Sequence, residues 1–249
     1  MNRRRISLWS PAIGAEGGLI AYGHYGRPLL AFPSQQGNSR QYEDNGMIEA
    51  LAGPLEAGLV KIYAVDSFDS GSWYREDLPL EERARMHGSY EDWILNQVVP
   101  FIRADSHNEQ IAVTGVSFGA YHAANFALKH AHVFPLALCQ SGVYDVTVVG
   151  GGQIGDQRGD AVYFNNPADY VASLGGDHLD WLRGQVNLLL LCGQGAWEDS
   201  TGALESTRRF AQLLGDKGIR HELDVWGYDV AHDWPAWRAQ IAHHLPRFL

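Results

Sequence analysis

A serine lies between two glycines in the pentapeptide Gly-Val-Ser-Phe-Gly at residues 115–119, which matches the pattern G-x-S-x-G. An apolar run at 111–114 precedes it and an alanine-rich segment at 120–130 follows it, so the sequence predicts a strand, a sharp turn and a helix. The glycines suit a turn in which larger side chains would collide. In this setting Ser117 is expected to be a nucleophile, with its hydroxyl raised above the edge of a sheet.

A serine hydroxyl needs a base to take its proton, and histidine is the usual one. The chain has 11 histidines, so position along the predicted fold must choose among them. His232 follows the last predicted strand and precedes the final helix, which puts it at the same sheet edge as Ser117. His122, His130 and His132 lie on or after the helix behind the serine and are expected to pack or face solvent. His232 is therefore the predicted base.

A carboxylate that orients the histidine is expected after the strand at 186–192, because the order serine, acid, histidine is typical of this architecture. Glu198 and Asp199 both stand in the loop that follows this strand. We favour Glu198 as the orienting acid and Asp199 as a helix cap, since carboxylates stabilise helix N-termini. The reverse assignment stays open, and Asp145, after the preceding strand, is a third choice.

Stabilising a negative oxygen in the transition state needs two backbone N–H donors. The N–H of Phe118, directly after the serine, is the first candidate because it begins the helix. The second is expected from the loop after the strand that ends at Phe32. Within the sequence Pro-Ser-Gln-Gln-Gly at 33–37 we choose Gln35, although this loop lacks the HGGG-type sequence common in lipases.

The candidate catalytic residues must be held in place by the strands and helices between them. The sequence predicts that strands alternate with helices along most of the chain. Apolar runs predict strands at 6–9, 19–22, 29–32, 60–65, 111–114, 136–139, 186–192 and 221–225. Helices are predicted at 48–59, with a break at 53–54, and at 80–103, 120–130, 204–214 and 234–249. The first two strands are expected to form an antiparallel ribbon. The whole predicts a single α/β domain over 1–249, with a mainly parallel sheet covered by helices on both faces.

Residues 145–183 are rich in Gly, Asp and Asn and are expected to form an irregular loop or insertion near the active site. Within them, Gly-Gly-Gly-Gln-Ile-Gly at 150–155 satisfies the dinucleotide pattern G-x-G-x-x-G. The sequence that follows is typical of a loop rather than of the helix such a site needs, so we expect a flexible loop and no cofactor. His130 and His132 have no carboxylate or cysteine at ligand spacing, and no metal is expected.

Composition excludes several classes of protein. With 19 Lys and Arg against 29 Asp and Glu, the formal net charge is −10, and the basic cluster at 3–5 is too small for a nucleic-acid binder. No apolar run reaches the ~18 residues that span a bilayer, and no signal peptide follows the basic start. Cys139 and Cys192 lie in apolar runs and are expected to be buried thiols. We therefore expect a soluble, cytoplasmic protein that acts on a small-molecule ester; homo-oligomers are left open.

Separated segments of the chain resemble the putative-esterase branch of the α/β-hydrolases, the group with esterase D, feruloyl esterases and mycolyltransferases. The segments are 115–122, 192–199 and 232–237, with a weaker match at 66–67 and 72–74. The similarity spans nearly the whole chain and is to small, uncapped bacterial members. It implies an α/β-hydrolase fold and serine chemistry without a cofactor. The chain departs from the family at Pro33-Ser34, where a His-Gly pair is commoner.

These features predict a serine esterase that hydrolyses a small carboxylic ester through a triad of Ser117, Glu198 and His232 and an acyl-enzyme intermediate. An acyltransferase is the first alternative, because an alcohol or amine acceptor can replace water at the same acyl-enzyme. A non-catalytic binding protein on this fold is the second alternative, since a fold does not fix a function.

Overall fold

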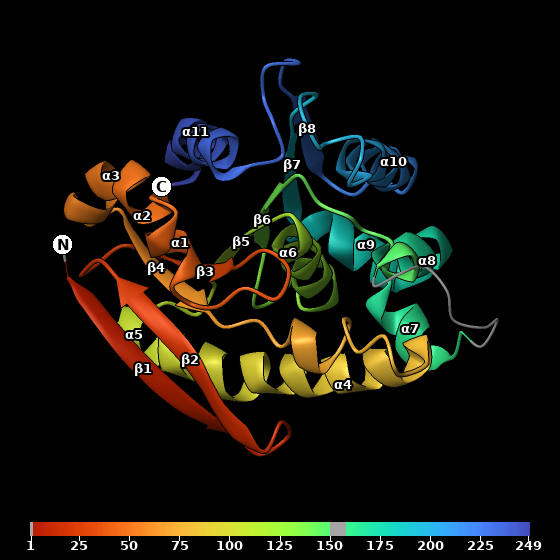
Figure 1. Cartoon of the computed structure of the whole chain (residues 1–249), viewed down its shortest axis with the longest axis horizontal. Coiled ribbons are helices and arrows are strands. Elements are labelled where there is room, and N and C mark those ends of the chain that lie inside the picture. The colour runs from red at the N-terminus through yellow and green to blue at the C-terminus, as the bar shows by residue number, and fades with distance from the viewer. Residues whose placement is uncertain (1, 150–157) are drawn as a thin grey trace.

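The fold is described for residues 2–149 and 158–249 from a computed structural model of the chain (Figure 1). Within these residues the strands form one twisted sheet of eight, in the order β1-β2-β4-β3-β5-β6-β7-β8. The strands are β1 (Arg3–Ser10), β2 (Ala15–Tyr22), β3 (Arg27–Phe32), β4 (Val60–Val65), β5 (Ala112–Val116), β6 (Leu136–Gln140), β7 (Asn187–Cys192) and β8 (His221–Val225). Every apolar run of the sequence analysis falls on one of them, with Ile111 and Val186 one residue before the starts of β5 and β7.

Strand direction divides the sheet into two parts. β1 pairs antiparallel with β2, and β2 pairs antiparallel with β4. From β4 through β3, β5, β6 and β7 to β8, each pair is parallel. The predicted mixed sheet with an antiparallel N-terminal ribbon is confirmed. Its ribbon is longer than predicted, with pairs from Arg3↔Tyr22 to Ser10↔Ala15, because polar residues on a half-exposed edge strand give no apolar signal.

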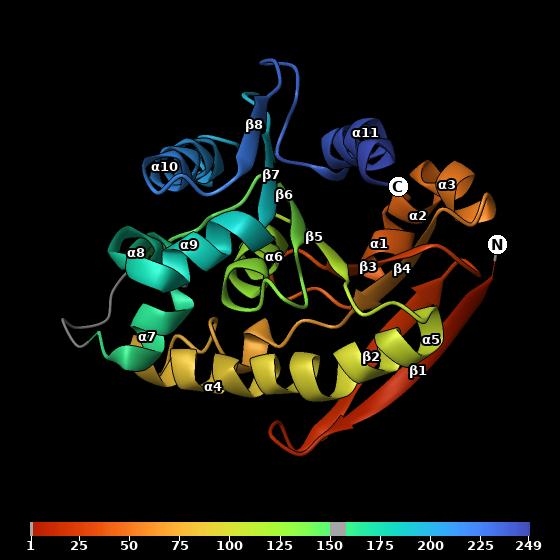
Figure 2. The same ribbon diagram turned by 180° about the vertical axis from the view of Figure 1, so that it is seen from behind.

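Successive strand residues contribute to two apolar cores, one on each face of the sheet. On one face Leu30 and Leu188 share a cluster with buried residues of α4 (Leu80–Trp93), α5 (Val99–Ser106), α6 (Phe118–Lys129) and α10 (Ala203–Asp216). On the other face Leu29 and Leu189 share a cluster with α1 (Gln41–Asp44), α2 (Met47–Ala50), α3 (Ala52–Glu56) and α11 (Trp234–His244). Figures 1 and 2 show α10 and α11 on opposite sides of β7 and β8. Helices therefore cover both faces, as predicted.

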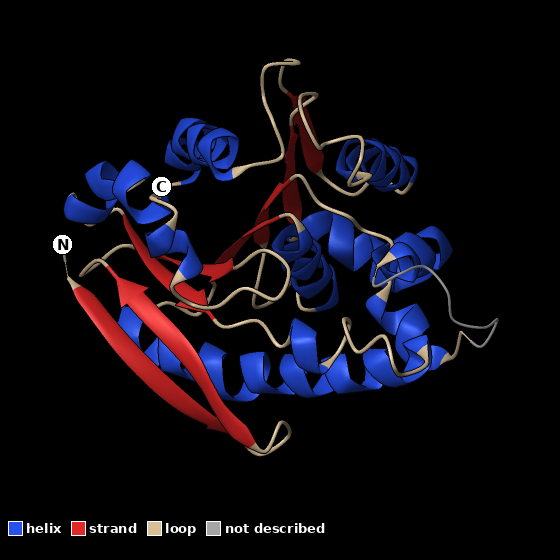
Figure 3. Cartoon of the chain, viewed as in Figure 1, coloured by secondary structure: helices blue, strands red, loops and turns tan. Residues whose placement is uncertain are grey.

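The long helix predicted at 80–103 is continuous in Figure 3, but its hydrogen bonding changes midway. α4 passes into a π-helical turn, η2 (Ile94–Val98), and then into α5. Pro100 stands in the first turn of α5 and has no N–H to donate, so a wider turn just before it relieves the conflict with the preceding carbonyls. The helix ends at His107, whose φ of 56° is the left-handed conformation of a C-terminal cap.

The prediction of an irregular segment at 145–183 is wrong for the described residues. They form η3 (Val146–Val148), α7 (Asp160–Asn165), α8 (Pro167–Ser173) and most of α9 (Gly176–Gln185). These helices are short, and α7 has its N-terminal N–H groups bound by the Glu81 carboxylate of α4. A cap supplied from so far along the chain leaves no local signal. The Gly-rich pattern at 150–155 lies outside the described residues.

Two short 3₁₀ turns complete the described elements, η1 (Asp69–Gly71) and η4 (Leu245–Phe248). In the part of the chain that the structure describes, no helix has the length and apolar composition needed to cross a membrane.

Candidate active site

Ser117 occupies a sharp turn between β5 and α6. Its φ of 54° and ψ of −122° lie in a region that residues with a Cβ rarely adopt. An ideal Cβ on Gly115 would lie 1.9 Å from the carbonyl oxygen of Gly119, and one on Gly119 would lie 2.2 Å from that of Pro33. Both flanking positions therefore require glycine. The turn presents the serine at the carboxyl end of β5, which is the predicted placement.

His232 lies in the loop between β8 and α11, and its imidazole forms hydrogen bonds with two side chains. Its Nε2 is 2.9 Å from the Ser117 Oγ, and its Nδ1 is 3.0 Å from Oε2 of Glu198. An ionised carboxylate can only accept, so Nδ1 carries the hydrogen and Nε2 accepts from the serine hydroxyl. Trp237 packs edge-on against the ring at a centroid distance of 5.1 Å. The structure thus brings together three residues from loops far apart in the sequence.

The Glu198 carboxylate is fully buried and accepts several hydrogen bonds. Oε1 accepts from Ser141 Oγ at 2.6 Å and from the N–H of Gly193 at 3.1 Å, and Oε2 accepts from Cys192 Sγ at 3.3 Å. Burial raises the pKa of Glu198, but the bonds from His232, Ser141 and Gly193 lower the pKa by more, so it lies below its ordinary value. The carboxylate therefore stays ionised at neutral pH.

The two other candidate acids do not contact the imidazole. Asp199 is exposed. Asp145 accepts from the N–H and Oγ1 of Thr147 and from the amide of Asn166, so it caps η3. The two acids belong to the surroundings of the site rather than to the hydrogen bonds around His232.

Sequence reasoning missed Ser141, and it missed the strained backbone of Trp197 directly before Glu198. Both have positive φ, 51° and 68°, a conformation that costs free energy in residues with a Cβ. Ser141 directly follows β6 and accepts from Trp237 Nε1 at 3.0 Å while it donates to Glu198. Its place after a strand at the carboxyl edge of the sheet is the one signal that could have indicated it. Trp197 gave no such signal.

The loop after β3, residues 33–37, lies directly against the serine turn. The N–H of Ser34 donates to Gln41 Oε1 at 2.8 Å, and that of Gln36 donates to Asp69 Oδ2 at 2.9 Å. The N–H of Gln35 between them has no hydrogen-bond partner within the described residues. The N–H of Phe118 opens α6 and has no partner within the helix. Neither of the two N–H groups predicted as oxyanion donors is thus used by these hydrogen bonds.

The side chain of Gln35 is held by a tyrosine. Tyr74 Oη donates to Gln35 Oε1 at 2.8 Å, and the Tyr74 ring meets Phe118 edge-on at 5.7 Å. Burial raises the pKa of Tyr74, so its hydroxyl keeps the proton that it donates. Tyr74 belongs to the weak match at 72–74 and here joins the two chain segments that carry the free N–H groups.

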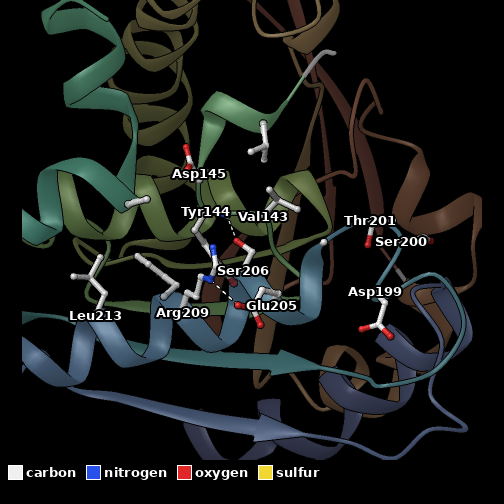
Figure 4. A pocket seen from close by; sticks show the side chains of 14 residues that line it. Val143, Tyr144, Asp145, Asp199, Ser200, Thr201, Glu205, Ser206, Arg209 and Leu213 are labelled. Atoms are coloured by element: carbon white, nitrogen blue, oxygen red, sulfur yellow. Dashed lines mark hydrogen bonds and ion pairs between the residues drawn. The ribbon is translucent and has the colours of Figure 1, made fainter. Parts of the chain in front are cut away.

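A cavity of about 550 Å³ lies beside the loop that follows β7 (Figure 4). Its wall includes Tyr144 and Phe210, whose rings stack at 4.2 Å between centroids. Asp145 and Asp199, the two acids that do not reach His232, are among its polar residues. His232 itself does not line it. The cavity therefore adjoins the acid loop without including the hydrogen-bonded histidine.

The remaining predictions concern the two cysteines and two histidines that do not contact His232. Cys139 and Cys192 are buried free thiols, as predicted. His130 pairs with Glu91 at 2.6 Å, and His132 lies near it in a surface turn. Within residues 2–149 and 158–249, no group of three or more His, Cys, Asp and Glu side chains is arranged to hold a metal ion.

Comparisons with known proteins extend the sequence resemblance. A protein-family model described as "Putative esterase" matches residues 31–248. A search of curated proteins gives no match. Among solved structures, a ferulic acid esterase superposes with a TM-score of 0.75 and 17% identity, over 99% of this chain and 97% of that one.

Two further solved structures are similar in fold over most of their length. FphF, a fluorophosphonate-binding serine hydrolase of Staphylococcus aureus, has a TM-score of 0.72 and 16% identity, over 99% of this chain and 97% of its own. MPT51 (FbpC1) of Mycobacterium tuberculosis has a TM-score of 0.70 and 14% identity, with the same coverage of 99% and 97%. Identities this low show that the fold is shared, whereas the family model identifies the family within that fold. The chain belongs to the putative esterase family of the α/β-hydrolases and is an esterase.

Proposed function

We propose that this esterase hydrolyses small carboxylic esters through an acyl-enzyme on Ser117. The observation that carries the proposal is the pair of hydrogen bonds at His232, 2.9 Å to the Ser117 Oγ and 3.0 Å to Glu198. An unassisted serine hydroxyl is a weak nucleophile, and an imidazole held in this tautomer can accept its proton.

In the first half of the reaction, the Ser117 Oγ attacks the ester carbonyl carbon while its proton passes to Nε2 of His232. The carbonyl oxygen becomes negative and is held by the N–H groups of Phe118 and Gln35. The ionised Glu198 stabilises the imidazolium that forms. The bond to the alcohol then breaks, the alcohol oxygen takes the proton from Nε2, and the acyl group remains on the serine.

In the second half, a water molecule takes the place of the alcohol. His232 Nε2 accepts a proton from the water while the water oxygen attacks the acyl carbon. The tetrahedral intermediate uses the same two N–H donors. It collapses to a carboxylic acid, and the Ser117 oxygen regains the proton from His232, which restores the free enzyme.

Hydrolysis of p-nitrophenyl acetate, butyrate and octanoate tests this proposal and gives the acyl length that the site accepts. Ser117→Ala is expected to lower kcat/KM by about 10⁴-fold or more. Ser173→Ala, a change at an exposed serine of α8, should leave the rate unchanged. Equal rates in the two variants would contradict the proposal. Product analysis with an added alcohol or amine separates the two kinds of enzyme by the fate of the acyl group. A hydrolase releases it only as the carboxylic acid, whereas an acyltransferase transfers it to the acceptor as a new ester or amide.

A further inference from the structure

A second histidine–carboxylate pair lies behind the candidate site. Asp69 opens η1, and His122 lies on α6, five residues after Ser117. His122 Nε2 is 2.8 Å from Asp69 Oδ1, and both side chains are only 1% exposed. Placing two ionisable groups in a protein interior costs free energy that an apolar pair would avoid. The pair therefore needs an explanation beyond packing.

The other oxygen of Asp69 supplies that explanation. Oδ2 accepts the N–H of Gln36 at 2.9 Å. Gln36 has a φ of 54°, which a residue with a Cβ adopts only when its surroundings hold it there. It is also the neighbour of Gln35, whose N–H is the second oxyanion donor of the proposed reaction. Asp69 therefore fixes the backbone beside that donor.

His122 connects this backbone to the helix that carries the first donor. Phe118, whose N–H is the other proposed donor, is on the same helix and packs against the His122 ring at 5.0 Å. Phe32, at the end of β3, lies at 5.7 Å. One chain of hydrogen bonds thus runs from α6 through His122 and Asp69 to the loop at 33–37, and it links the two segments that carry the N–H groups.

The surroundings leave the imidazole little freedom to move. His87 and Tyr90 of α4 close it in from the other side, at 5.3 and 5.5 Å between ring centroids. Within the described residues the Nδ1 of His122 has no hydrogen-bond partner, so the bond to Asp69 is its one polar anchor. If this bond were lost, one oxygen of the Asp69 carboxylate would be buried without a hydrogen-bond donor.

We propose that Asp69 and His122 are positioning residues for ester hydrolysis, which hold the loop at 33–37 so that the Gln35 N–H aims at the same point as the Phe118 N–H. This role rests on the proposed function of Ser117. It concerns the transition state, because the negative oxygen that both donors bind exists only there.

Asp69→Ala removes the acceptor and is expected to lower kcat by about 10- to 100-fold, with KM within about threefold of the wild type. The dissociation constant of an alkyl trifluoromethyl ketone should rise by the same factor as kcat falls, because its hemiketal oxygen occupies the oxyanion position. Asp69→Asn should keep most of the activity, since its amide oxygen still accepts from Gln36.

Two further variants separate positioning from folding. The double change Asp69→Leu with His122→Leu replaces both polar groups by apolar ones and is expected to keep a melting temperature near that of the wild type, yet to lose kcat as Asp69→Ala does. His130→Asn removes another paired histidine at the end of α6. It should lower the melting temperature without changing kcat or inhibitor affinity.

The outcomes distinguish this inference from the proposed function. Wild-type turnover that does not depend on Ser117 would overturn the proposed function and the positioning role together. In another outcome, turnover depends on Ser117, but the folded double variant keeps both the kcat and the inhibitor affinity of the wild type. That result would overturn the role of Asp69 and His122 alone.

Discussion

Glu198 and Asp199 are neighbours that differ by one methylene group, but only Glu198 reaches the imidazole. The difference comes from the backbone between β7 and α10. Trp197 takes a φ of 68°, and the carboxylate after it turns inward to four donors, while Asp199 faces outward along the cavity of Figure 4. Sequence alone could not choose between these acids, because both follow the same strand and both suit a helix N-terminus.

Paired substitutions test which carboxylate orients His232. Glu198→Gln is expected to lower kcat/KM by about 10²- to 10⁴-fold, because an amide cannot stabilise the imidazolium and favours a different tautomer. Asp199→Asn should change it by less than about threefold, as for other exposed positions. The kinetics of p-nitrophenyl acetate hydrolysis measure both effects. A larger loss in the Asp199 variant would reverse the assignment.

His122 shows how a residue of the site escapes sequence reasoning. It lies in the run Ala-Tyr-His-Ala-Ala at 120–124, which is apolar around the whole helix. A helix of that kind is buried on all sides, so a buried histidine needing a partner could have been inferred. Asp69, its partner, opens η1, 53 residues earlier, and carries no local signal. From the sequence, His122 is expected to pack or face solvent; the helix pattern could have indicated its burial, but not its partner.

At the scale of elements, the order of strands and helices follows from periodicity, whereas their interruptions do not. The turn at 115–119 was predictable because the strand, the glycines and the helix that the pattern needs are all local. The capping of α7 by Glu81 depends on a contact with α4, far away along the chain. Short helices such as α7 lack enough turns to show a period.

Two glycine substitutions test the roles assigned to elements. Gly88 lies inside α4, where an added Cβ would meet no atom within 4 Å. Gly88→Ala is expected to raise the free energy of unfolding by about 0.5–1 kcal/mol without changing activity, because glycine is a poor helix former. Chemical denaturation measures the gain. A loss of stability there would show that the helix surroundings are tighter than described.

Gly119→Ala serves as the matched change at the serine turn. Its Cβ would lie 2.2 Å from the Pro33 carbonyl oxygen and 2.5 Å from that of Phe32, so the loop at 33–37 must shift. We expect a loss of about 1–3 kcal/mol in stability and a fall in kcat/KM. Unchanged kinetics would contradict the close packing of this loop on α6.

At the scale of the whole molecule, α4 and the end of α6 are joined by a partly buried ion cluster. The Glu91 carboxylate bonds to His130 Nε2 at 2.6 Å and to Lys129 Nζ at 2.5 Å. Burial raises the pKa of Glu91, but its two partners lower the pKa by more, to about 2. Since the pKa is depressed in the folded state, this carboxylate stabilises the protein above about pH 4.5, and the contribution is lost as pH falls toward about 2.

Glu91→Gln is accordingly expected to be less stable than the wild type at pH 7 and to lose less stability between pH 4.5 and pH 2. Urea denaturation at a series of pH values measures the difference. Glu56→Gln, at an exposed carboxylate, is the control and should follow the wild-type curve. Parallel curves for all three proteins would show that Glu91 does not couple folding to protonation.

The central claim is that His232 makes the Ser117 hydroxyl reactive, and covalent labelling tests it most directly. After incubation with a fluorophosphonate, peptide mapping by mass spectrometry should find one adduct, on Ser117. His232→Ala should slow its formation by about 10³-fold or more while the protein stays folded. An unlabelled wild-type serine, or equal labelling rates with and without the imidazole, would contradict the account.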